Sequence, residues 1–217
     1  MTSSARPYRS ALRTRQAEET RARIVAAAAR LFAAQGYQAT TISAIAKEAG
    51  VSAETVKTTA AKAELLIAAF EVTFSGSEAA ETLADTEAGS GLTTLPDDVF
   101  LDAVITQIAA ANERGHALWT VLLGAGLSDP VVDAALQRIL ANRAADYRGF
   151  AAELQRRGIV HSDRDGDALA DVLSFLLSPE SHQQLVVQSG WSPERYRSWL
   201  RSAVLAAASP SAADATR

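Results

Sequence analysis

Short polar and basic side chains are concentrated between residues 52 and 62, where Ser52, Thr55, Lys57, Thr58 and Lys62 occur within one short stretch. A lysine ammonium can donate to the edge of guanine, and a threonine offers a hydroxyl together with a methyl group, so this set could read base edges in the major groove of DNA. A hydroxyl or a backbone N–H at the start of a helix can also bind phosphate. The stretch therefore predicts contact with both the bases and the backbone of a nucleic acid.

Each of these residue types also has an ordinary structural use, which remains an alternative. A hydroxyl before a helix serves as an N-cap with or without DNA, and an exposed lysine is often a solvated charge and nothing more. The residues that we predict to contact DNA are Thr41, Ser52, Ala53, Thr55, Lys57, Thr58 and Lys62.

Two short helices that meet at a glycine should position this set. Apolar residues recur at i, i+3, i+4 and i+7 before the glycine, and they are Ile42, Ile45, Ala46 and Ala49. Gly50 follows where the chain must reverse, since a residue without Cβ tolerates left-handed backbone angles. Ser52 is a good N-cap for the next helix, which turns Val56 inward. The pattern predicts a helix-turn-helix, whose second helix enters the major groove.

The flanking elements extend this unit to a small helical domain over residues 20–66. A first helix is expected from about Thr20 to Gln35, ended by Gly36, with Tyr37 packed under the corner. Its buried stripe should be Ile24, Ala27, Ala28, Leu31 and Phe32. A fourth helix should start near Lys62 and link this domain to the rest of the chain. Residues 1–19 carry four arginines without apolar periodicity and are expected to form a flexible basic arm. Its arginines could reach a minor groove of DNA, or the arm could simply be disordered.

The composition favours an all-α protein with a charge asymmetry. Hydrophobic residues make up 48% of the 217 residues, and few Gly and Pro interrupt the apolar runs. Net charge is −4, but residues 1–70 hold ten Lys and Arg against five Asp and Glu, whereas the remainder holds eleven against twenty. A basic end on an acidic body fits nucleic-acid binding confined to that end. The absence of cysteine, of a secretory signal and of a membrane-spanning run favours a cytoplasmic location.

The rest of the chain, residues 67–208, reads as a helical body. Helices are expected over about 97–112, 116–123, 130–157, 168–177 and from 193 onward, with a loop within 76–97 and a disordered tail at 209–217. The break expected between residues 112 and 116 contains Gly115, and Gly124 and Gly126 are expected to close the second of these helices. The sequence offers no internal repeat.

An enzyme is the rival class, and the sequence argues against it. The three histidines, His116, His161 and His182, lie far apart, and no nucleophile elbow, phosphate loop or zinc-protease motif occurs. The run from Asp163 to Asp167 fails as a calcium loop, because its glycine stands at position four and position twelve is Ser174. We therefore expect no catalytic residue, no metal site and no cofactor.

Residues 28–56, A-A-R-L-F-A-A-Q-G-Y-Q-A-T-T-I-S-A-I-A-K-E-A-G-V-S-A-E-T-V, resemble the TetR family of transcriptional regulators. They match that family's first-helix ending, the aromatic after Gly36, the threonine before the second helix and the I-A-x-x-A-G-V-S turn. The family usually continues with an aromatic pair and then a lysine, whereas here K-T-T-A-A-K follows Val56 and both aromatics are missing. Aligning Lys62 with the family lysine requires a loop one residue shorter.

The resemblance implies a DNA-binding regulator, in most cases a repressor, that acts as a homodimer on a palindromic operator and is released by a small molecule. The alternative is a helix-turn-helix protein that has lost DNA binding and serves as a protein-interaction module. Effector-lining candidates in the body are Phe100, Gln107, Asn112, His116, Trp119, Tyr147, Phe150 and Phe175. Candidates for the dimer interface on the last two long helices are Leu169, Val172, Leu173, Leu176, Tyr196, Trp199, Leu200 and Val204. Ordinary core packing explains both sets locally as well.

Overall fold

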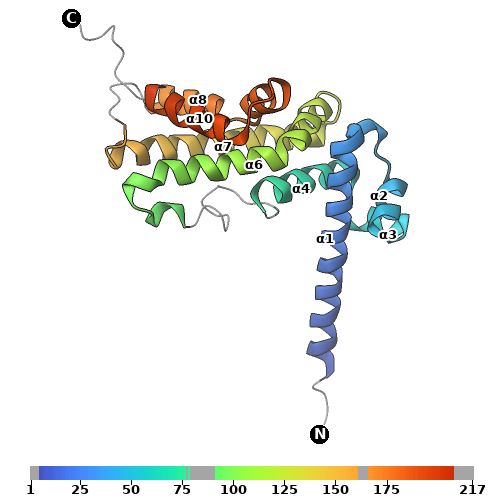
Figure 1. Cartoon of the computed structure of the whole chain (residues 1–217). Coiled ribbons are helices and arrows are strands. Elements are labelled where there is room, and N and C mark those ends of the chain that lie inside the picture. Colours follow the sequence, from blue (N-terminus) through green and yellow to red (C-terminus); the bar gives the residue numbers. More distant parts are fainter. Residues whose placement is uncertain (1–4, 77, 79–90, 161–165, 208–217) are drawn as a thin grey trace, which may run out of the picture.

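The computed structural model describes residues 5–76, 78, 91–160 and 166–207, with side chains from residue 13 onward (Figure 1). Every regular element in these ranges is helical, which confirms the all-α prediction. The predicted tail at 209–217 and the rejected calcium loop at 163–165 lie outside the described residues.

The N-terminal domain consists of α1 (Ala5–Ala39), α2 (Ile42–Ala49) and α3 (Ala53–Thr59), and α4 (Lys62–Ser75) follows it. Gly36 interrupts α1 with a φ of 79°, so the regular helix ends there as predicted. α4 packs against α1 on one side and against α6 and α7 on the other. It thereby connects the N-terminal domain to the body, as the sequence suggested.

The body is a stack of long helices on the other side of α4 (Figure 1). Its elements are η2 (Leu92–Thr94), α6 (Asp97–Gly126), α7 (Pro130–Arg156), α8 (Gly166–Leu176), α9 (Pro179–His182), the π-helical η3 (Gln183–Gln188) and α10 (Pro193–Ala207). α7 begins as predicted, because the Asp129 carboxylate accepts hydrogen bonds from the N–H groups of Val131 and Val132. Its end before Gly158, where φ is +67°, also matches the prediction.

The predicted arm is helical from Ala5 onward, which corrects the expectation of a flexible segment. Its sequence holds good helix formers, and its proline stands in the first turn, where a missing N–H costs nothing. Arg15 and Glu19 add an i,i+4 ion pair with 3.1 Å between Nε and Oε1. α1 therefore projects well beyond the domain that it belongs to (Figure 1).

The two helices expected over 97–112 and 116–123 form a single helix, α6, which corrects the predicted interruption at Gly115. Gly115 lies where α6 meets Phe74 of α4, and a Cβ at this position would stand 2.9 Å from the Phe74 Cδ2 atom. The glycine therefore permits a close helix crossing and does not break the helix. Gly124 also lies within α6, whose end comes after Gly126.

Two clusters of buried side chains hold the fold together. The first, rich in alanine, joins the α1–α4 core to the C-terminal half of α6 and the first turns of α7, through residues such as Val56, Leu66 and Leu122. The second, rich in leucine and aromatic residues, joins the remainder of α6 and α7 to α8 and α10. Within the described part of the chain, no helix is long and apolar enough to cross a membrane.

Candidate nucleic-acid interface

The unit formed by α2, Gly50 and α3 follows from local capping chemistry. The Thr41 hydroxyl accepts a hydrogen bond from the Ala44 N–H at 3.1 Å, and the Ser52 hydroxyl accepts one from the Thr55 N–H at 3.0 Å. Gly50 adopts the left-handed conformation with φ of 68°. Val56 is fully buried and anchors α3 on the core, which confirms its inward orientation. The geometry is that of a helix-turn-helix.

The outer surface of α3 presents Lys57 and Thr58, both exposed. Lys57 forms no ion pair with the side chains that the structure describes, so its ammonium can meet a base or a phosphate. The Thr58 hydroxyl donates to the carbonyl of Glu54 at 3.0 Å, which leaves its lone pairs and methyl group outward. Lys57 and Thr58 are thus the predicted DNA contacts that the structure leaves most accessible.

The remaining candidates on this unit are engaged in the fold. The Thr55 side chain is half-buried, and its hydroxyl shares a 2.8 Å hydrogen bond with the Ser52 hydroxyl. Ala53 is also half-buried and packs against the core of the domain. Thr41 is exposed and caps α2, so it can still donate its O–H proton outward. Cap and DNA contact are therefore compatible at Thr41 and Ser52.

Lys62 is turned toward the body. Its Nζ atom stands 4.4 Å from the centre of the Tyr37 ring, a cation–π contact, and its side chain is half-buried. Burial lowers the pKa of Lys62, and the nearby Asp129 carboxylate acts in the opposite direction. In this conformation the Lys62 side chain contributes to the junction between the two domains more than to a contact with DNA.

A hydrogen bond between Tyr37 and Asp129 joins the N-terminal domain to the body, and no local sequence pattern indicates it. The Tyr37 hydroxyl donates to Asp129 Oδ2 at 2.7 Å, while Oδ1 of the same carboxylate caps α7. The bond with Tyr37 is the main reason why the pKa of Asp129 is lowered, and burial raises the pKa of Tyr37. Since Tyr37 also stacks on Phe32, one side chain contacts the core of α1 and the first turn of α7.

Arg21 makes a second tie on the other side of α3. Its guanidinium donates to the carbonyl of Thr59, the last residue of α3, at 3.4 Å, and to the Glu78 carboxylate at 2.7 Å. The bond with Glu78 is the largest cause of the raised pKa of Arg21. The end of α3 is therefore linked, through α1, to the segment that follows α4.

Four of the eight predicted effector-lining residues lie around one segment, residues 177–183. The Asn112 Nδ2 group donates to the carbonyls of Leu177 and Ser178 at 3.0 and 3.1 Å, and the Tyr147 hydroxyl donates to the Leu177 carbonyl at 3.3 Å. These carbonyls directly follow α8, and that of Ser178 also accepts hydrogen bonds from the His182 N–H and the Ser181 hydroxyl. Asn112 and Tyr147 thus fix the end of α8, a structural use that the sequence did not indicate.

His116 and Trp119 approach the same segment from α6. The His116 Nδ1 atom lies 2.9 Å from Gln183 Oε1, and the Trp119 indole N–H donates to Glu180 at 2.9 Å. The Arg143 guanidinium lies 5.9 Å from the Trp119 ring and 6.0 Å from the Tyr147 ring. The protein's own cation therefore occupies the space between these two aromatic rings.

The other four effector candidates lie elsewhere. Phe100 and Phe150 pair with each other, with ring centres 6.1 Å apart, in the leucine-rich cluster. Gln107 is half-buried on α6, and Phe175 is 68% exposed on α8. The structure therefore does not bring these four to the segment that Asn112 contacts.

His182, which lies far from His116 in the sequence, completes the polar cluster inside the body. It is 4% exposed, and its ring centre lies 5.2 Å from that of His116 and 5.4 Å from that of Tyr196. Burial, followed by the neighbouring His116, lowers its pKa, and Glu113 acts in the opposite direction. Asn112 Oδ1 and His182 Nδ1 are both buried without a hydrogen-bond partner among the described residues. The π-helical η3 that follows is a local irregularity of a kind often found at functional sites.

The predicted dimer residues divide into an inner and an outer set. Five are at most 1% exposed within the protomer and cannot reach a second copy, namely Leu169, Leu173, Tyr196, Leu200 and Val204. Val172, Leu176 and Trp199 are half-buried and lie nearer the surface. Phe175, placed by the sequence in the effector set, is the most exposed aromatic side chain on α8.

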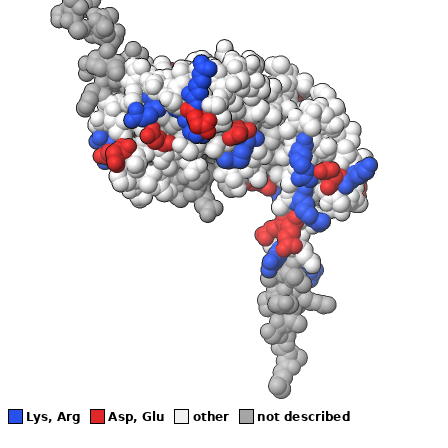
Figure 2. All heavy atoms as spheres, in the orientation of Figure 1, with Lys and Arg blue, Asp and Glu red and all other residues white. Residues whose placement is uncertain are grey.

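Figure 2 shows basic and acidic side chains interleaved over the surface, also where α1 leaves the N-terminal domain. No group of three His, Cys, Asp or Glu residues that could hold a metal ion occurs within the ranges that the structure describes.

A family model matches part of the N-terminal domain. The family model described as "Bacterial regulatory proteins, tetR family" matches residues 24–57, which contain α2, Gly50 and most of α3. No curated protein matches the chain.

Solved structures of regulators share the fold of the whole described chain. A protein described as a TetR-family transcriptional regulator from Rhodococcus sp. aligns with a TM-score of 0.69 at 19% identity, covering 88% of this chain and 100% of its own. A transcriptional regulator from Saccharomonospora viridis in complex with choline gives 0.65 at 22% identity, covering 85% and 95%. The TetR family protein CprB from S. coelicolor A3(2) gives 0.51 at 22% identity, covering 88% of both chains.

Proposed function

Because the chain has the DNA-binding domain and the fold of the TetR family of transcriptional regulators, which are not enzymes, we propose that it is a sequence-specific repressor. It acts as a homodimer on a palindromic operator and leaves the DNA when a small molecule binds its body. This proposed action on an operator takes place in the cytoplasm.

The observation that carries the proposal is the exposed surface of α3. Lys57 and Thr58 stand outward from a helix whose other faces are fixed by Val56 and by the Ser52 cap. A helix of this kind reads three or four bases, which is too little to select one site in a genome, so a second copy is required.

Selection of bound sites from random duplex DNA, followed by titration of the recovered site over a range of salt, tests this function. A regulator should enrich a palindrome and lose affinity steeply as salt rises, because each neutralised phosphate releases counterions. Absence of any enriched site, with folded protein in dilute buffer, would favour the alternative of an interaction module that has lost DNA binding.

Lys57 is expected to read a base. Lys57→Ala should cost about 1–3 kcal/mol in operator binding and relax the preference at one position of each half-site. Lys47, exposed in the last turn of α2, offers a matched control, and Lys47→Ala should leave the base preference intact. An unchanged preference for Lys57→Ala in the selection would show that this lysine contacts no base.

We further propose that the outer faces of α8 and α10 form the homodimer contact. The accessible apolar side chains there are Val172, Phe175, Leu176 and Trp199. The inner residues of the same helices hold α8 and α10 on the body, so the interface would rest on a well-packed support.

For the effector we propose a site in the polar cluster of the body. The relative from Saccharomonospora viridis was solved in complex with choline, so this fold is compatible with a small-molecule ligand. Among the described residues, Asn112 Oδ1 and His182 Nδ1 are buried side-chain atoms without a hydrogen-bond partner. An effector that formed hydrogen bonds with both atoms would gain binding free energy from each of them.

The route from this cluster to the DNA would run through α6 to Asp129 and Tyr37. A ligand that binds more tightly to the conformation with poor DNA spacing shifts the population toward it. A metabolite screen by thermal stability, followed by operator titration with each hit, tests the effector. If no stabilising compound alters operator affinity, effector release should be discarded while DNA binding stands.

A further inference from the structure

The N-terminal part of α1 buries little of its described surface, where only Thr20 and Arg21 are half-buried. Residues 13–19, 22 and 23 are all exposed, and the helix continues back to Ala5. From Ala5 to Ala22 it spans about 25 Å at 1.5 Å per residue. A helix with no packed face is marginal by itself, because most helical stability in proteins comes from tertiary packing. The segment therefore calls for a partner.

A row of cations and hydrogen-bond donors runs along this helix. It recurs at alternating intervals of three and four residues, which places its positions on one helical face. The members of this donor row are Arg6, Arg9, Arg13, Gln16, Thr20 and Arg23. Arg15 stands off the row and pairs with Glu19.

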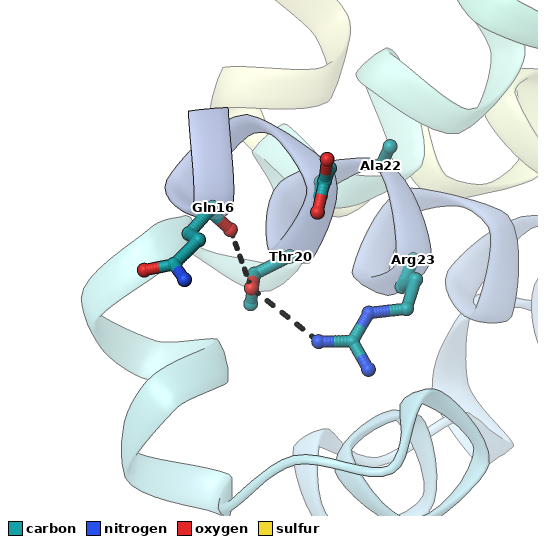
Figure 3. A pocket seen from close by; sticks show the side chains of 5 residues that line it. Gln16, Thr20, Ala22 and Arg23 are labelled. Atoms are coloured by element: carbon teal, nitrogen blue, oxygen red, sulfur yellow. Dashed lines mark hydrogen bonds between the residues drawn. The ribbon is translucent and has the colours of Figure 1, made fainter. Parts of the chain in front are cut away.

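The part of the donor row nearest the DNA-binding domain borders a hollow on the surface of α1 (Figure 3). Gln16, Thr20 and Arg23 line it together with Glu19 and Ala22. The Arg23 guanidinium donates to the Thr20 hydroxyl at 3.4 Å, and that hydroxyl donates to the Gln16 carbonyl at 2.8 Å. These bonds orient the polar side chains along the helix and leave the hollow open.

The direction of α1 indicates what kind of partner its N-terminal part can reach. The helix leaves the domain on the side of α3 and runs clear of the body (Figure 1), so a duplex read by α3 would be the nearest large surface. An arginine binds phosphate through two parallel N–H groups, and duplex DNA presents phosphates at regular intervals. At 3.4 Å per base step, about 25 Å covers roughly seven base pairs.

We propose that residues 5–23 of α1 are a second DNA-contacting element, which lays the donor row against the phosphate backbone of the duplex that flanks each operator half-site. The inference rests on the proposed function and adds to it a contact that carries affinity without base preference. Phosphate contacts position a protein on DNA, whereas base contacts specify the sequence.

The test compares Arg6→Ala/Arg9→Ala/Arg13→Ala with the off-row control Arg15→Ala in the full-length protein. Alanine favours helix, so the substitutions preserve the element, and circular dichroism verifies this. Binding is measured by fluorescence anisotropy between about 50 and 200 mM salt, on the selected operator with and without flanking base pairs.

On flanked DNA the triple variant should lose about 0.9 in the slope of log K against log salt for each lost contact, hence about 2–3 per protomer, while its base preference stays unchanged. On trimmed DNA the wild type should fall to the level of the triple variant. The control should match the wild type throughout.

Equal slopes for the triple variant and the wild type on flanked DNA would overturn this inference and leave the proposed function intact. A changed oligomeric state of the triple variant in sedimentation would overturn it too, since the row would then contact a second copy. Failure of the wild type to bind any duplex would overturn both proposals together.

Discussion

The DNA-binding domain and the body distribute polar and apolar side chains in opposite ways. In the former, polar groups such as Lys57 and Thr58 face outward and alanine-rich packing fills the inside. In the body, Asn112 and His182 are buried, while Phe175 is 68% exposed. The first arrangement suits a hydrated, charged partner. The second suits an apolar contact outside and an adjustable polar cluster inside.

The outer face of the body should respond most strongly to substitution. Phe175→Asp should weaken dimerisation about 100-fold or more, because an unpaired carboxylate buried in an apolar contact costs several kcal/mol. Sedimentation at several protomer concentrations measures the change. Operator affinity should fall with it, since one protomer holds only one half-site.

Leu127, 91% exposed at the turn after α6, provides a matched control for Phe175. Leu127→Asp should leave dimerisation unchanged. Both variants should unfold within about 0.5 kcal/mol of the wild type when compared as monomers, as exposed positions do. Equal dimerisation of the two variants would show that the contact between copies lies elsewhere.

The inside of the body should be next in magnitude. Asn112→Leu keeps the shape of the side chain but removes both hydrogen bonds to the Leu177 and Ser178 carbonyls. Each carbonyl keeps a second donor, the Tyr147 hydroxyl at Leu177 and the Ser181 hydroxyl at Ser178, so loss of the two amide bonds should lower the free energy of unfolding by about 2 kcal/mol.

Urea denaturation at fixed protomer concentration checks this value, with Thr106→Ala on the exposed side of α6 as the control. The control should change stability by less than about 0.5 kcal/mol. If the two variants proved equally stable, the Asn112 amide would not be what holds the end of α8.

The junction between the two regions should respond less in stability and more in regulation. Tyr37→Phe retains the stack on Phe32 and removes only the bond to Asp129. We expect a loss of about 1.5–2 kcal/mol, at the low end for a hydrogen bond to a charged group, because both side chains are only half-buried. Operator affinity with and without an effector, measured for the variant, shows whether the bond transmits the signal.

Asp129→Asn keeps the shape of the capping residue and makes the bond with Tyr37 a neutral one. If Tyr37→Phe and the wild type showed the same ratio of operator affinities with and without effector, the bond would be structural alone. A smaller ratio in Tyr37→Phe, with Asp129→Asn between the two, would support transmission.

The sequence predicted best what local chemistry determines. The Thr41 and Ser52 caps and the Gly50 turn depend on residues at most four positions away, and all three are found where they were expected. The Tyr37–Asp129 bond and the Asn112 contacts join residues 92 and 65 positions apart, which no local pattern reports. Gly115 was misjudged for the same reason, because its use depends on Phe74 of another helix.

The prediction for the N-terminal part of α1 was wrong for a different reason. Its residues lack apolar periodicity, the main sequence signal for a helix, and the described side chains at 13–19 are all exposed. The donor row has a helical period of its own, but its members are polar and a search for buried faces ignores them. A periodic row of arginines is thus a sequence signal for a helix whose partner lies outside the protein.

The smallest predicted effect concerns the pH dependence of the body. His182 has a lowered pKa in the fold, mainly because it is buried, so the native protein resists a proton that the unfolded chain accepts. As the pH falls through about 6.5, the ordinary value for histidine, the unfolded state takes up this proton first and stability must decrease. The dependence stays below about 1.4 kcal/mol per pH unit, the limit for one proton.

His182→Phe keeps an aromatic ring against Tyr196 and removes the titrating group. Urea unfolding between pH 7.5 and 5.5 should therefore show a shallower loss of stability in this variant than in the wild type. Because the His116 ring centre lies 5.2 Å from that of His182, the difference reports His182 together with its coupling to His116. Parallel curves would mean that the native protein accepts a proton at His182 as readily as the unfolded chain, and that the polar cluster can already hold a charge. An effector for such a cluster would have to be sought among anions, because a cation would then meet a positive His182.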